Sequence, residues 1–188
     1  MKFVDLSREI YHRTPAHPSH PPVVMGTWYD HDEVKVAGAT RFTSKALHLS
    51  LSDHAGTHVD APCHFNAASD AASIDEMPLA DFYTSAFCLD LSHVPLKHEI
   101  TVAEMEGALA ATGESIRKRD TVLINMGVNK RLWGTPGYAT DFPGLHVTAV
   151  HWLADQGCKI FGVEAVSPAP VGEPNYKAHL ACGERGIT

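Results

Sequence analysis

The distribution of apolar and polar residues along the chain predicts strands that alternate with helices. Leu47, Leu49 and Leu51 alternate with polar neighbours, which is typical of a half-buried strand. Further on, unbroken apolar runs are typical of strands buried on both faces. The predicted strands cover residues 2–6, 43–51, 86–91, 121–126 and 159–163.

Helix signals occupy the intervals between the later strands. Thr101-Val102-Ala103-Glu104 has the form of a capping box and predicts a helix through Ala111 that ends before Gly113. Two more helices are predicted over 147–156 and 176–182, each followed by a glycine. The alternation indicates a mixed α/β fold without internal repeats.

Length and composition are compatible with a single domain. The chain has 188 residues, of which 44% are hydrophobic, enough to bury one core over residues 1–188. Prolines and histidines fill residues 11–22, which predicts a loop. An apolar run of about 18 residues, the length that spans a membrane, does not occur, so no membrane span is expected.

Charge and cysteine usage narrow the class of protein. The net charge of −7 and the lack of a basic run disfavour nucleic acid as a partner, and a small-molecule ligand is expected instead. The four cysteines, Cys63, Cys88, Cys158 and Cys182, form no C-x-x-C pair. We therefore expect free thiols and a cytoplasmic protein.

The strongest candidate for chemistry is a cluster of metal-ligand side chains. His54, His58, Asp60 and His64 fall within eleven residues. Imidazole and carboxylate are ligands of catalytic zinc, and three of them leave a position open for water. The fourth group, His64, is placed to act as the base.

The backbone between these residues is expected to be a turn and an extended segment. Gly56 favours a turn at Ala55-Gly56, and Pro62 keeps Ala61 extended. His58, Asp60 and His64 would then alternate on one side. Scattered surface histidines are the alternative, because the chain has 13 of them; an enriched window is not decisive by itself.

The complete string resembles a known signature. Residues 54–65 read H-A-G-T-H-V-D-A-P-C-H-F and are similar to the H-x-G-T-H-x-D-x-P-x-H-F motif of the Putative cyclase family. That family of metal-dependent hydrolases includes bacterial kynurenine formamidases and isatin hydrolases. The resemblance continues through the segments 4–7, 74–79, 143–145 and 160–164.

The resemblance implies a swivelling β/β/α fold and a metal-dependent hydrolase that opens a small N-formyl or cyclic amide, like an arylformamidase of tryptophan catabolism. His54, His58 and Asp60 would bind a divalent metal, with zinc expected and manganese as the second choice. His64 would move the proton of the attacking water, and His179 would help to hold a second ion. A homodimer or homotetramer is implied as well.

Two other functions stay open. The same residues would serve a lactone hydrolase or cyclase, and a truncated relative would bind metal without turnover. The glutamate that follows the late histidine in the family is not reached before Thr188, so we expect the domain to lack the family's C-terminal segment. His17, His20 and His31 either line the pocket, bind metal or are merely exposed. The role of Glu164 and the identity of the substrate are not predicted.

Overall fold

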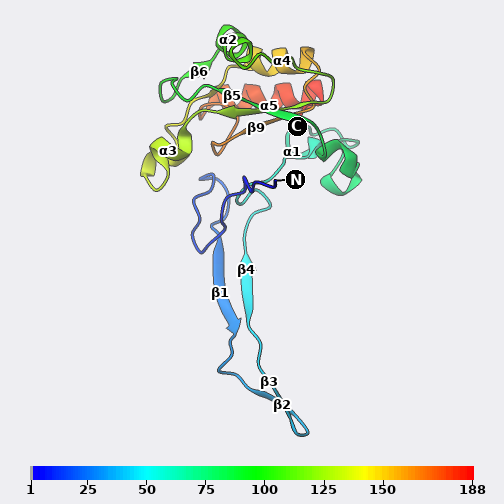
Figure 1. The fold of residues 1–188 in the computed structure, drawn as a ribbon, viewed down its shortest axis with the longest axis vertical. Coiled ribbons are helices and arrows are strands. Elements are labelled where there is room, and N and C mark those ends of the chain that lie inside the picture. Colours follow the sequence, from blue (N-terminus) through cyan, green and yellow to red (C-terminus); the bar gives the residue numbers. More distant parts are fainter. Residues whose placement is uncertain (1) are drawn as a thin grey trace. The chain divides into compact units, whose positions relative to one another are not determined.

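The computed structural model describes residues 2–188 (Figure 1). Contacts within the chain divide it into two compact units, Met1–His58 and Val59–Thr188. Each unit is described by itself. The single domain predicted from the sequence stays a prediction.

The first unit is built on a long β-hairpin. Strand β1 (Val24–Tyr29) pairs antiparallel with β4 (Ala46–Ser50), and β2 (Lys35–Ala37) pairs with β3 (Thr40–Phe42) further along the same hairpin (Figure 1). Gly38 and Ala39 form the two-residue turn at the tip. Gly38 has a φ of +60°, which the first central residue of a hairpin turn requires and glycine adopts without strain.

The sequence predicted this unit incompletely. The strand expected at 43–51 is confirmed as β4, but the strand expected at 2–6 is wrong, because residues 2–10 form neither strand nor helix. Strand β1 was not predicted. Its segment, V-M-G-T-W-Y, has no clean alternation, and Gly26 lowers its intrinsic preference for a strand.

The second unit contains a parallel three-stranded sheet. Strands β5 (Ala86–Asp90), β7 (Thr121–Asn125) and β9 (Ile160–Val163) lie in the order β5-β7-β9. All three lie where the apolar runs predicted strands. Beyond β9, the N–H of Thr188 donates to the carbonyl of Lys159 (3.1 Å), and the N–H of Phe161 donates to the carbonyl of Thr188 (2.9 Å).

Three helices accompany this sheet, in the places that the sequence predicted. They are α2 (Val102–Thr112), α4 (Val147–Asp155) and α5 (Glu173–Arg185), of which α4 and α5 lie side by side (Figure 1). The capping box of α2 is confirmed, because Glu104 Oε2 accepts from the N–H of Thr101 at 2.7 Å. Gly113 ends α2 with a φ of +72°.

Helix α5 is longer than predicted. It begins at Glu173 with Pro174 in its first turn, runs through Gly183 and ends at Arg185, followed by the C-cap residue Gly186, whose φ is +60°. Gly183 therefore lies inside the helix. A Cβ atom there would meet the carbonyl oxygen of Phe65 at 3.3 Å, so this glycine provides a close approach to another segment.

Short elements complete the second unit. They are α1 (Pro62–Phe65), η1 (Ile74–Glu76), η2 (Leu79–Phe82), β6 (Glu99–Ile100), α3 (Val128–Leu132), η3 (Pro136–Ala139) and β8 (Gly144–Leu145). Strands β6 and β8 pair in parallel.

One hydrophobic core fills the second unit. Its largest fully buried side chains include Leu89, Leu91, Ile100, Met105, Met126, Phe142, Leu145, Leu153 and Ile187. The loop between β7 and α4 joins this core, because Trp133 and Tyr138 meet edge to face with ring centroids 4.9 Å apart. Those aromatic residues therefore pack inward. Among the described residues, no helix has the length and apolar character needed to cross a membrane.

Gly144 supports the packing of β8 in a way that can be tested. A Cβ atom at Gly144 would lie 2.4 Å from the Cα of Ala169, a distance that only movement of the backbone relieves. We expect Gly144→Ala to lower the free energy of unfolding by about 1–3 kcal/mol or more, measured by urea denaturation. The control is Gly107→Ala in the exposed part of α2, where a Cβ meets nothing within 4 Å. This control should raise stability by about 0.5–1 kcal/mol. Equal effects of the two substitutions would contradict the packing argument.

Candidate metal centre

A tight turn in the first unit positions the first two histidines of the motif. The N–H of Ala55 donates to the carbonyl of Ser52 (3.1 Å), and Gly56 has a φ of +72°. A Cβ at Gly56 would lie 2.8 Å from Cγ1 of Ile10, so the close approach also favours glycine. Thr57 anchors the turn to the N-terminal segment, because its Oγ1 accepts a hydrogen bond from the N–H of Arg8 at 2.8 Å. The hydrogen-bonded turn is centred on Asp53 and His54, two residues before the predicted Ala55-Gly56, and the chain bends on through residues 55–57.

The turn brings the rings of His54 and His58 together. Nδ1 of His54 lies 3.1 Å from Nε2 of His58. On the far side of the second ring, Nδ1–H of His58 donates to the carbonyl of Gly56 at 2.9 Å. Because Nδ1 carries the proton, the lone pair of a neutral His58 lies on Nε2, and this is the form that binds a metal.

An acidic side chain lies on the outer side of His54. Nε2 of His54 lies 3.7 Å from Oδ2 of Asp53, which is within ion-pair distance but too long for a normal hydrogen bond. The Ser52 hydroxyl, which donates to the carboxylate, and the nearby imidazole of His54 lower the pKa of Asp53 from its ordinary value. A carboxylate on the outer nitrogen of a histidine is a common arrangement around protein-bound metals.

In the second unit, Pro62 starts a short helix in place of the extended segment predicted from the sequence. Ala61 is extended, as expected (φ −77°, ψ 156°), but α1 begins at the next residue. The N–H of His64 donates to the carbonyl of Ala61 at 2.9 Å. The predicted alternation of His64 with Asp60 is therefore wrong, because proline fixes a φ that suits the first turn of a helix.

Helix α5 brings His179 to the same place as α1. Single ligand atoms of Asp60, His64 and His179 all lie within 4.8 Å of one another. The rings of His64 and His179 meet at a tilt with centroids 5.6 Å apart. A carboxylate and two imidazoles at these distances fit a divalent metal ion.

His179 is held by a partner on its outer nitrogen. Its Nδ1–H donates to the carbonyl of Asn175 at 2.7 Å, which leaves Nε2 to face Asp60 and His64. Asn175 is itself buried, and its Oδ1 accepts from the hydroxyl of Ser167 at 2.6 Å. Sequence reasoning missed Asn175, although its place one helical turn before His179 was visible in the sequence.

All five predicted site residues thus belong to one of two groups. His54 and His58 meet in the first unit, and Asp60, His64 and His179 meet in the second. A single residue, Val59, separates His58 from Asp60 in the sequence. The roles of the five residues stay predictions, but the donor set fits a divalent metal.

The cysteines do not add a thiolate to these groups. All four are free, as expected. Burial, helped by the negative charge of Asp60, raises the pKa of Cys182 to about 12. Burial likewise raises the pKa of Cys158 to about 11. Both thiols therefore stay protonated at neutral pH, which disfavours them as nucleophiles and as ligands.

Glu164 has a structural role that the sequence did not predict. Its two carboxylate oxygens accept from the N–H groups of Val128 (2.9 Å) and Asn129 (3.1 Å) at the start of α3. The residue at the N-cap of α3 is Gly127, which has no side chain to do this. Glu164 therefore caps α3 from the end of β9.

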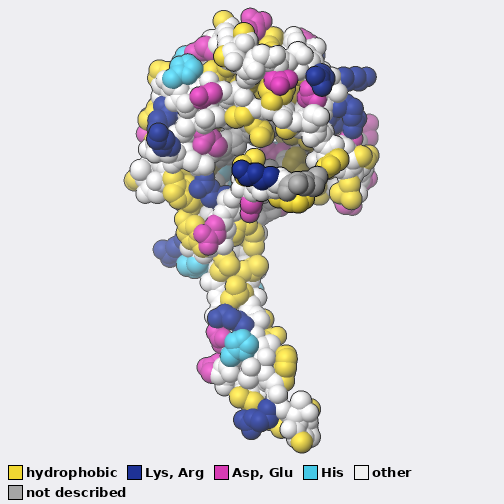
Figure 2. Space-filling view, viewed as in Figure 1, with side chains coloured by type: hydrophobic (Ala, Val, Ile, Leu, Met, Phe, Trp, Pro, Cys, Tyr) yellow, Lys and Arg dark blue, Asp and Glu magenta, His cyan; other side chains and the backbone are white. Residues whose placement is uncertain are grey.

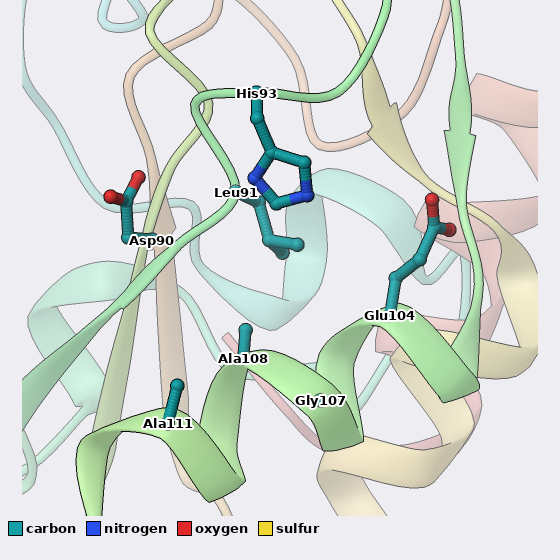
Figure 3. Close-up of a pocket in the computed structure, with 7 residues that line it drawn as sticks. All are labelled: Asp90, Leu91, His93, Glu104, Gly107, Ala108 and Ala111. Carbon is teal, nitrogen blue, oxygen red and sulfur yellow. The ribbon is translucent and has the colours of Figure 1, made fainter.

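A cavity of about 280 Å³ lies elsewhere in the second unit (Figure 3). It is lined by Asp90, Leu91, His93, Glu104, Gly107, Ala108 and Ala111. Its acidic groups already have partners, because Glu104 caps α2 and binds His98, and Asp90 accepts from the N–H of Ser92. None of the five predicted site residues lines this cavity.

Comparison with known proteins agrees with the motif. The family model described as Cyclase: Putative cyclase matches residues 4–170. Kynurenine formamidase of Salinibacter ruber is 27% identical over all of this chain and 80% of its own length. Kynurenine formamidase of Bacillus cereus is 25% identical over 74% of this chain, which covers only 60% of that relative.

Solved structures support the same fold. Isatin hydrolase A from Labrenzia aggregata, bound to benzyl benzoate, superposes with a TM-score of 0.79 at 24% identity, over 98% of this chain and 77% of that structure. The predicted fold is confirmed by this likeness. The name of these relatives, kynurenine formamidase, agrees with the enzyme class predicted from the sequence. The chain belongs to the Cyclase family.

Proposed function

We propose that the chain hydrolyses a small N-formyl or cyclic amide, in the manner of an arylformamidase, with a zinc ion held by His54, His58 and Asp60. One observation carries the proposal: the nitrogens of His54 and His58 face each other at 3.1 Å while the outer nitrogen of His58 is fixed by a carbonyl. The names of the kynurenine formamidase relatives support the choice of an amide.

The distance between the two facing nitrogens suits a tetrahedral ion. Zinc–nitrogen bonds of about 2.0–2.1 Å at a tetrahedral angle place two ligand nitrogens about 3.3 Å apart. The nitrogens of His54 and His58 therefore need to separate only slightly. The carboxylate of Asp60, two residues after His58 in the sequence, would complete the three ligands that leave one position open.

His64 would carry the proton through the reaction. When bound, the ion polarises the scissile carbonyl and makes water a nucleophile at neutral pH. His64 would accept one proton from the attacking water and deliver it to the leaving nitrogen, so that the amine departs neutral. The second proton of the water would stay on the acid, which loses it to the solvent and becomes a carboxylate. The neighbouring ring of His179 limits the orientations open to His64.

The second group of residues allows for a second ion. Asp60 is common to the motif and to the cluster with His64 and His179, and a carboxylate can bind two ions with its two oxygens. We propose that His179 holds this second ion when zinc is in excess. The fixed outer nitrogen of His179 supports this role.

Metal analysis tests the ligands. We expect His58→Ala to weaken zinc binding, because a direct ligand is lost. The loss of affinity should exceed the ~10–100-fold that follows when only the hydrogen-bond partner of a ligand is removed. His179→Ala should keep the first zinc and lose only a second one. Both are measured by titration with zinc against a competing chelator, with His93→Ala as the control, since His93 lies at the separate cavity. Full zinc affinity in His58→Ala would contradict the assigned ligand set.

Kinetics test the proton carrier. We expect His64→Asn to lower kcat for formanilide by about 10²–10⁴-fold while the first zinc ion stays bound, because a general base is lost and the first ligand set is intact. His93→Asn is the matched control and should retain full activity. If His64→Asn keeps full turnover, His64 is not the base.

The same assay separates the alternative functions. Turnover of a small lactone without turnover of formanilide would favour the lactone hydrolase. Zinc binding without any turnover would favour a non-catalytic relative. Activity that resists chelation would contradict the metal mechanism in every form.

The hairpin of the first unit supports a proposal about assembly. Leu47 and Leu49 of β4 lie on one face and are 48% and 53% exposed, and Trp28 of β1 is 72% exposed. Figure 2 shows hydrophobic side chains along this hairpin. A two-stranded hairpin is marginally stable alone, and contiguous exposed apolar surface marks an interaction site. We propose that the hairpin pairs with a second copy of the chain in a homodimer or homotetramer.

Light scattering after size-exclusion chromatography tests this assembly. Leu49→Lys should shift the protein towards the monomer, because a charge would be buried in the paired face. The control is Leu79→Lys in η2, which is also an exposed leucine (86%) but lies outside the hairpin. The same mass for both variants and the wild type would contradict pairing through the hairpin.

A further inference from the structure

The segment His17-Pro18-Ser19-His20 forms a tight turn. The N–H of His20 donates to the carbonyl of His17 at 3.0 Å, and Pro18 occupies the second position, where its fixed φ favours a turn. The hydroxyl of Ser19 lies 2.7 Å from Nδ1 of His17 and holds that ring. The turn therefore presents two imidazoles from a rigid backbone.

One of these imidazoles lies against a proposed metal ligand. The ring centroids of His17 and His20 are 5.4 Å apart, and those of His20 and His54 are 4.9 Å apart. His20 belongs to neither of the groups whose ligand atoms lie within 4.8 Å of one another. His20 therefore lies beside the proposed ligand His54 without being part of a candidate metal site itself.

His20 also carries a polar atom that calls for a partner. Its Nδ1 is buried and has no hydrogen-bond partner among the described residues. Buried polar side-chain atoms are nearly always hydrogen-bonded in native proteins. A nitrogen of this kind beside a catalytic ligand is suited to bind a polar group of the substrate.

The residues of the segment that carries the turn favour an acceptor, above all an anion. Residues 11–22 contain one arginine and three histidines and no acidic residue. Asp53, the acidic residue at the ring of His54, is already engaged there. From this geometry we infer that Nδ1–H of His20 binds a carboxylate on the substrate, so that the enzyme prefers an amide that carries an acid group near the scissile bond.

This inference rests on the proposed function, and binding of reaction products tests it without turnover. The probes are 2-aminobenzoate and aniline, which differ by one carboxylate, titrated calorimetrically into the zinc-loaded 188-residue chain. Wild type should bind 2-aminobenzoate more tightly than aniline. His20→Phe keeps a ring without nitrogens and should weaken 2-aminobenzoate binding by about 10- to 100-fold, because a hydrogen bond to a charged group is lost. Aniline binding should not change.

Two further variants identify the nitrogen. The amide of asparagine reaches about the position of Nδ1, so His20→Asn should retain 2-aminobenzoate binding within about threefold. The amide of glutamine reaches the position of Nε2, so His20→Gln should behave like His20→Phe. His48→Gln, on the exposed part of β4, is the matched control and should bind like wild type. If circular dichroism shows that His20→Phe does not fold, the difference in 2-aminobenzoate binding between His20→Asn and His20→Gln tests the inference in its place.

The kinetic arm separates this inference from the proposed function. With 2-formamidobenzoate and formanilide as substrates, His20→Phe should raise KM for the first compound alone and leave kcat and zinc content unchanged. Unchanged binding of 2-aminobenzoate in His20→Phe would overturn the inference even if both amides are hydrolysed. Loss of zinc in His20→Phe would overturn it as well, because His20 would then be a ligand. Binding that depends on His20 without any hydrolysis would support it and contradict the proposed function.

Discussion

The candidate centre depends on the fixing of imidazole rings through their outer nitrogens. A free histidine ring rotates and exchanges its proton between two nitrogens, so it presents a metal-binding lone pair only part of the time. Here backbone carbonyls bind the Nδ1–H groups of His58 and His179, which selects one tautomer and one orientation in each ring. In both cases the carbonyl belongs to a residue close in sequence. Local backbone geometry is therefore enough to prepare the ligands.

This explains why so much of the centre could be predicted from the sequence. One turn sets the spacing of His54, His58 and Asp60. Gly56 indicates this turn in the sequence, because glycine adopts a positive φ without strain. His64 was recognised as a site residue, but its backbone was not, because Pro62 is compatible both with an extended segment and with the first turn of a helix. His179 was found only through the resemblance to a family. Nothing local indicates that a residue 115 positions after His64 will lie beside it.

The fold was predictable to different degrees in the two units. Strands β5, β7 and β9 are buried in a parallel sheet, so their apolar runs are visible in the sequence. The capping box of α2 and the helix α4 follow equally clear local signals. Strand β1 has no such signal, because its side chains are not sorted into a buried and an exposed face. Its partner β4 does alternate leucines with polar residues, although that strand is almost wholly exposed as well.

The glycine inside α5 has a mechanical consequence for the centre. Gly183 lets α5 approach the carbonyl of Phe65, the residue that directly follows His64, while His179 lies one turn earlier on the same helix. One backbone contact therefore sets the gap between two imidazoles that come from distant parts of the chain. Helix α5 acts here as a rigid spacer. The distance between its axis and the backbone at Phe65 is short because residue 183 has no side chain. A single added methyl group would change that distance, although it would touch neither histidine.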